Sequence, residues 1–145
     1  MDYSQIGGKI YVRVDRNEEI LSSVLTVCTS RQVRSATFHG IGACGDVTTA
    51  TYIPENDAFT NHQKKGMLEM VSLEGNVTHD DKGQLFQHAH AMFSYLDGDK
   101  TAFFGGHLIG ATVLYTAEIV IEPIEGDGIG RMTDPVTGIT VWRLS

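Results

Sequence analysis

Three histidines lie close together in the second half of the chain: His88, His90 and His107. Between them, Asp97-Gly98 is typical of a two-residue type I′ hairpin turn, because both central residues of that turn need positive φ. If these two residues form the turn, the flanking runs pair as antiparallel strands and His88 stands opposite His107. Side chains two apart on a strand share a face, as do directly opposed side chains. All three imidazoles are therefore predicted to project from one side of the hairpin.

This arrangement suits a metal ion. Opposed Cβ atoms lie about 4.5–5.5 Å apart and residues two apart about 6.5–7 Å, a triangle on which three imidazoles can converge. In this register Gly105 lies opposite His90 and adds no crowding side chain, although a bulge at Gly105-Gly106 would shift the register. Three neutral nitrogens suit zinc, and nickel, copper or iron would also bind. Three protein ligands leave a fourth position open, unless another protein ligand or a neighbouring subunit fills it. The alternative is that the imidazoles only pack and form hydrogen bonds.

Three further side chains could serve the same site. His39 lies in a glycine-rich stretch and could line the pocket or contact a metal ligand; an ordinary half-buried histidine is the alternative. Glu69 and Glu74 lie on or beside a strand predicted to neighbour the histidine hairpin, where either could act as a general base. Each could equally be a solvated or ion-paired carboxylate. Arg131 and Asp134, near the end of the chain, are expected to form a structural contact.

The elements that must position these residues follow from hydrophobic periodicity. Apolar residues recur at helical spacing from Ile20 to Cys28, which predicts one helix with Asn17 as its N-cap, ending before Arg34. Strands are expected at residues 10–14, 35–43, 47–53, 67–72, 75–79, 113–122 and 139–144. The glycines of the second strand predict a bulge or a close backbone approach, and the polar segment 55–65 is expected to be a mobile loop. Many strands with one N-terminal helix indicate an α+β domain built on a mostly antiparallel sheet.

Length and charge narrow the possible functions. The chain has 145 residues, which suits a single domain over residues 1–145. No apolar run could span a membrane, no signal peptide is evident, and Cys28 and Cys44 are expected to be reduced, buried thiols of a cytoplasmic protein. The formal charge is −7, from 18 acidic and 11 basic residues, with no basic run beyond Lys64-Lys65. This charge disfavours binding to a polyanion such as DNA.

Several motifs in this order resemble a known family. They are Phe38-His39-Gly40-Ile41-Gly42-Ala43, the run 68–77 (LEMVSLEGNV), His88-Ala89-His90, Phe104-Gly105-Gly106-His107-Leu108 and Glu118-Ile119-Val120-Ile121. Together they resemble the plants-and-prokaryotes-conserved (PPC) domain over nearly the whole chain. The resemblance implies an α+β fold that assembles as a homotrimer. It also implies a metal, thought to be zinc, on the histidines matching His88, His90 and His107. Plant members bind DNA through AT-hooks with an Arg-Gly-Arg core, which this sequence lacks.

Two functions are therefore open. The first is a zinc-binding PPC domain that acts as a regulatory or DNA-associated module, and it predicts nucleic-acid retention with a steep salt dependence. The second is a metal-dependent enzyme acting on a small polar substrate at an open three-histidine site. It predicts a concave pocket with carboxylates near the metal. The sequence contains no recognisable nucleophilic serine or cysteine motif.

Overall fold

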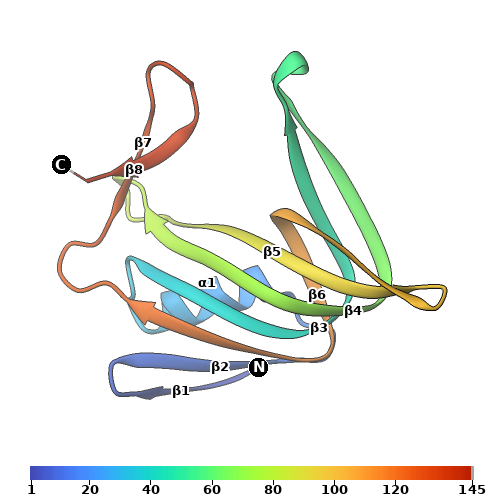
Figure 1. Ribbon diagram of the computed structural model, residues 1–145. Helices are drawn as coiled ribbons and strands as arrows, with labels where there is room; N and C mark the ends of the chain where they lie inside the picture. Colours follow the sequence, from blue (N-terminus) through green and yellow to red (C-terminus); the bar gives the residue numbers. More distant parts are fainter. Residues whose placement is uncertain (145) are drawn as a thin grey trace.

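The computed structural model describes residues 1–144 as one eight-stranded sheet with a single α-helix among those residues (Figure 1). The elements are β1 (Asp2–Ile6), β2 (Lys9–Asp15), α1 (Ile20–Ser30), β3 (Ala36–Ile53), the 3-10 turn η1 (Pro54–Asn56), β4 (Ala58–His79), β5 (Leu85–Asp97), β6 (Lys100–Pro123), β7 (Gly130–Thr133) and β8 (Thr140–Arg143). All strand pairs are antiparallel apart from the pairing of β4 with β7. The predicted α+β fold with a mostly antiparallel sheet is confirmed. No helix within residues 1–144 has the length and apolar character needed to cross a membrane.

The central strands close on themselves. The last part of β6 pairs with β2 and β3, whereas its first part pairs with β5. Because β3 also pairs with β4, and β4 with β5, the strands β6, β3, β4 and β5 form a closed ring. Along β5 the side chains alternate, so that Ala89, Ala91 and Phe93 are buried inside the ring. His88 and His90 consequently point outward.

The predicted helix is present, but its N-cap is Glu19 and not Asn17. The Glu19 carboxylate accepts hydrogen bonds from the backbone N–H groups of Leu21 (3.1 Å) and Ser22 (2.7 Å). It also accepts one from the N–H of Ala111 on β6, at 3.1 Å. Asn17 has φ +69° and lies outside the helix. The prediction was wrong because a carboxylate that caps the helix and also contacts β6 satisfies more backbone donors than an asparagine cap would.

Replacing Glu19 by alanine is expected to lower the free energy of unfolding by about 2–3 kcal/mol, because three backbone donors lose a charged acceptor. Urea unfolding of the purified variant measures this change. Glu125→Ala is the control, since Glu125 is exposed and a surface change of this kind costs about 0.5 kcal/mol or less. Equal losses in the two variants would contradict the role given to Glu19.

The predicted loop at residues 55–65 belongs mostly to a strand. Residues 58–65 pair with 46–53 as the two sides of a hairpin that projects from the body of the molecule (Figure 1). We call residues 46–65 the arm. The loop prediction was wrong because polar side chains exposed on an arm do not prevent the backbone from pairing. The backbone pairing is also continuous where the sequence predicted breaks. The strands predicted at 35–43 and 47–53 form one β3, and those predicted at 67–72 and 75–79 belong to one β4.

The glycine-rich stretch of β3 lies tightly against β6, as predicted. A Cβ on Gly40 would lie 2.5 Å from the backbone oxygen of Glu118, and one on Gly42 would lie 2.6 Å from the Cβ of Ala117. The register of β3 against β4 also shifts between these two glycines. The close approach and the bulge together allow β3 to coil around the ring.

Candidate metal centre

The β5–β6 hairpin turns at Gly98 and Asp99, one residue later than predicted. Of these two, only Gly98 has positive φ (65°), which fits a type II′ turn with glycine at its first central position. Moving the turn by one residue shifts the pairing by two, so His107 faces His90 and not His88. The predicted register is therefore wrong. Because an even shift leaves every side chain on its original face, the three histidines still share one side of the sheet.

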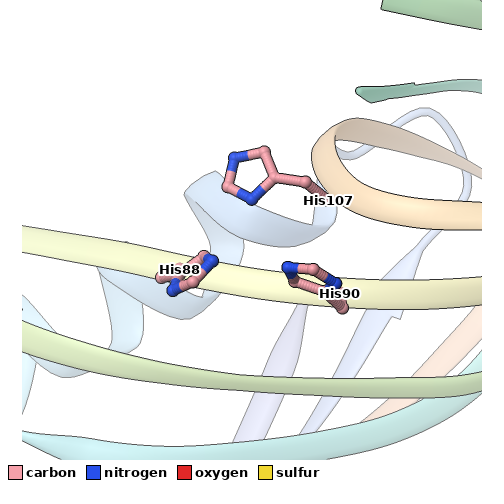
Figure 2. A group of neighbouring side chains, drawn as sticks. All are labelled: His88, His90 and His107. Atoms are coloured by element: carbon pink, nitrogen blue, oxygen red, sulfur yellow. The ribbon is translucent and has the colours of Figure 1, made fainter. Parts of the chain in front are cut away.

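The three imidazoles form a compact cluster on the outer face of β5 and β6 (Figure 2). One ligand nitrogen from each ring lies within 4.8 Å of the others, and the ring centroids are 5.0–5.5 Å apart. Nitrogens bound to one tetrahedral zinc lie about 3.3–3.5 Å apart, as follows from zinc–nitrogen bonds of about 2.0–2.1 Å. Small rotations of the exposed His88 and His90 rings would close the difference. The donor set and its spacing thus fit a divalent transition metal.

His107 reaches this cluster because β6 changes partners at that residue. It pairs with His90 on β5 and with Ala50 on β3. The preceding residue, Gly106, has φ +143°, a conformation that strains other residues. A single glycine therefore permits the bend that places His107 above β5.

Partial desolvation by neighbouring side chains and repulsion between positive charges favour the neutral forms of two of these histidines, although the His88 ring still reaches solvent. The pKa of His88 is lowered by burial first, and then by the positive charges of His107, His90 and Arg131. The pKa of His107 is lowered by burial and then by His90. Neutral imidazole is the form that binds a metal. At pH 7 the neutral forms of His88 and His107 are therefore favoured, and these forms can coordinate an ion.

The metal-free protein is expected to lose stability as the pH falls below about 6.5. The pKa values of His88 and His107 lie below their ordinary 6.5 in the folded chain. The unfolded chain then binds more protons, so the free energy of unfolding decreases as pH falls through this range. Urea unfolding between about pH 7.5 and pH 5.5, with a chelator present, measures the slope. The double variant His88→Gln/His107→Gln should show a shallower slope, and an unchanged slope would contradict the assignment.

The other predicted site residues lie outside the cluster. Glu74 is the cross-strand neighbour of both His90 and His39, but its carboxylate is not among the ligand atoms within 4.8 Å. His39 and Glu74 instead line a groove of about 650 Å³ that extends toward β1 and β2. The nearest carboxylate to His39 is recorded at 4.0 Å, on Glu122. Glu69 lies further along β4, next to a separate hollow beside Tyr95. Roles for these three residues in the metal centre stay predictions.

Two neighbours of the cluster were missed from the sequence. Phe59, on the arm, has its ring centroid 5.7 Å from that of His107, and its segment was mistaken for a loop. Arg131, on β7, lies with its guanidinium 5.1 Å from the ring centroid of Phe86. The prediction that Arg131 contacts Asp134 is wrong. Asp134 instead accepts hydrogen bonds within its own turn, from the backbone N–H and the hydroxyl of Thr137. No periodic pattern in the sequence links either residue to the histidines.

The two cysteines supply no nucleophile. Cys28 and Cys44 are free and buried, as predicted. Burial raises the pKa of the Cys28 thiol to about 11, and burial with the nearby Glu19 charge raises that of Cys44 to about 12. Both thiols are therefore protonated and unreactive near neutral pH.

The fold and the cluster define a class: a small α+β domain whose closed strand ring carries three histidines on its outer face. The chain belongs to the Plants and Prokaryotes Conserved domain family (PCC, also written PPC), whose model matches residues 1–125. This confirms the resemblance seen in the motifs. Among curated proteins, none matches the sequence.

Solved structures of the same fold come from bacteria and archaea. A plant- and prokaryote-conserved protein of Pyrococcus horikoshii is 29% identical, with a TM-score of 0.81 over 98% of this chain and 94% of that one. A protein of Bacteroides thetaiotaomicron, described as a candidate DNA-binding protein, is 25% identical, with a TM-score of 0.88 over 98% and 96%. A metal-containing protein of Archaeoglobus fulgidus is 25% identical, with a TM-score of 0.83 over 99% of both chains.

Proposed function

We propose that this protein is a metal-binding PPC domain that holds zinc through His88, His90 and His107. The observation that carries the proposal is the convergence of three imidazole nitrogens within 4.8 Å on one exposed face. The similarity to the metal-containing protein of A. fulgidus supports it. Zinc suits three neutral nitrogens and a tetrahedral geometry best, while nickel, copper or iron are the competing occupants.

Three protein ligands would leave part of the coordination sphere open to another molecule. A zinc ion in such a position supplies Lewis acidity to whatever binds there. The imidazoles of His88 and His90 are exposed to solvent, so a small ligand or a neighbouring subunit can approach the centre. We therefore infer that the centre binds a further group and is not a closed structural site.

Metal content of the purified, untagged protein is the direct test. Elemental analysis with no added metal should find about one zinc ion per chain, since one three-imidazole cluster binds one ion. A protein without bound metal, even after incubation with zinc and removal of the excess, would contradict the proposal. The histidines would then be packing and hydrogen-bonding residues.

For the biological role we propose a regulatory module that acts as a homotrimer, as the PPC resemblance implies. Solved structures described as candidate DNA-binding proteins share the fold. A net charge of −7 argues that this chain alone contributes little attraction to DNA. Light scattering coupled to gel filtration tests the trimer. Retention on immobilised duplex DNA at low salt, lost steeply as salt rises, would support DNA as a partner.

A metal-dependent enzyme is the second candidate, favoured by the position of Glu74. This carboxylate faces His90 across β4 and β5 and also lines the groove of about 650 Å³. None of the three histidines lines that groove, so Glu74 is the residue through which a small polar substrate in the groove would adjoin the cluster. Zinc-dependent hydrolysis of simple esters, lost in Glu74→Gln while zinc is retained, would support this candidate. Equal rates in both proteins would exclude this role for Glu74.

A further inference from the structure

Arg131 lies beside the histidine cluster. Strand β7 joins the sheet where Gly130 pairs with His79 at the end of β4, so the β7–β8 hairpin rises next to the start of β5 (Figure 1). The Arg131 guanidinium stacks over the ring of Phe86. Phe86 precedes His88 by two residues on β5, and side chains with that spacing share a face about 6.5–7 Å apart. The stacking on Phe86 therefore places the guanidinium on the same face of β5 as His88.

The guanidinium of Arg131 lacks an acidic partner within residues 1–144. Lys9, Arg13, Lys65 and Arg143 each pair with a carboxylate. Among the arginines without such a pair, Arg16, Arg31 and Arg34 are exposed, and only Arg131 is partly buried. Arg131 is half-buried and makes no ion pair or hydrogen bond through its guanidinium with the described residues, although the chain has 18 acidic side chains. A planar guanidinium held on an aromatic face presents its donor fork to an incoming oxyanion.

We propose that Arg131 and the three-histidine centre together bind a small molecule through its carboxylate or phosphate group. The inference rests on the proposed metal site and names the class of ligand that completes it. Three neutral imidazoles leave a bound divalent ion with its full positive charge, so a second cation on the same face of β5 makes the space between them favourable for an anion. Bidentate hydrogen bonds from arginine would then orient the oxyanion.

The β7–β8 hairpin that carries Arg131 lies beyond the match to the family model, but solved structures of the same fold cover 98–99% of this chain and so extend over it. Arg131 follows the residues 1–125 that the family model matches. The histidines fall within those residues, whereas the β7–β8 hairpin falls outside them. In the proposed site the histidines come from the part of the chain that the family model matches, and Arg131 comes from the hairpin that follows it.

The test uses the intact protein loaded with Co²⁺, whose visible absorption reports changes at the metal. Metal content is measured first in the wild type, Arg131→Gln and Arg31→Gln. Arg31 is the matched control, because its guanidinium also stacks on an aromatic ring, that of Tyr3, away from the cluster. Inorganic phosphate and acetate are then titrated separately into each protein.

The expected result is that one of the two anions changes the absorption of the wild type. Its dissociation constant should rise about tenfold or more in Arg131→Gln and stay unchanged in Arg31→Gln, as for the loss of a charge-assisted hydrogen bond. Tighter binding of phosphate or of acetate assigns the ligand class. Arg131→Lys keeps the positive charge but loses the two-pronged guanidinium, so its dissociation constant for the anion should lie between those of the wild type and Arg131→Gln. This variant replaces Arg131→Gln in the test if Arg131→Gln does not fold.

The two proposals fail in distinguishable ways. If the wild type binds no metal, the proposed function is wrong and the anion site falls with it. If all variants bind metal but neither anion alters the spectrum, or the affinity is equal with and without Arg131, only the anion site is overturned.

Discussion

Alanine in place of His107 is expected to reduce bound zinc from about one ion per chain to almost none. His107 is the only one of the three imidazoles contributed by β6, and it faces His90 directly across the hairpin. The two histidines left on β5 would supply only two ligands, too few to hold zinc against solvent. Loss of an outer contact to a metal ligand already costs roughly 10–100-fold in affinity, so loss of a ligand should cost more than about a hundredfold.

Elemental analysis and competition with a coloured zinc chelator measure this loss. His62→Ala is the control, because His62 is exposed on the arm and is not part of the three-histidine cluster. Circular dichroism and thermal unfolding establish that both variants fold. Zinc retained by folded His107→Ala, or lost equally from His62→Ala, would show that the metal is bound elsewhere.

Gly105→Ala is expected to lower the free energy of unfolding by about 3 kcal/mol and to weaken zinc binding as well. A Cβ at this position would overlap the backbone oxygen of Ala91 and lie 3.0 Å from the Cα of Met92. Both contacts are with the backbone of β5, which cannot rotate aside as a side chain can, so β5 and β6 must separate. Because His107 follows Gly105 by two residues, that separation would also move it away from His90.

Gly110→Ala is the matched control on the same strand. A Cβ there would meet only the Glu19 carboxylate at 3.8 Å, an ordinary contact. We expect a change of about 0.5 kcal/mol or less for this variant. Urea unfolding and zinc competition of both variants test the prediction. Similar behaviour of the two would show that β5 and β6 can separate locally without cost.

Local sequence patterns determined the helix, the faces of the strands and the family. Ile20, Val24 and Cys28 recur at helical spacing and are buried along one side of α1. The period of two along a strand places His88 and His90 on one face whatever the partner strand is. For this reason an even error in the register left the predicted cluster intact. The motifs around the histidines indicated the PPC family, which the match over residues 1–125 confirms.

Tertiary structure alone decided which residues surround the histidines. His107 reaches them because β6 leaves β5 for β3 at that residue, and closure of the strand ring sets that position. Phe59 and Arg131 approach from two hairpins far away in the sequence. Glycine at position 105 is required by the close β5 backbone, not by space for an ion. These contacts depend on long-range strand pairing, on which local periodicity carries no information.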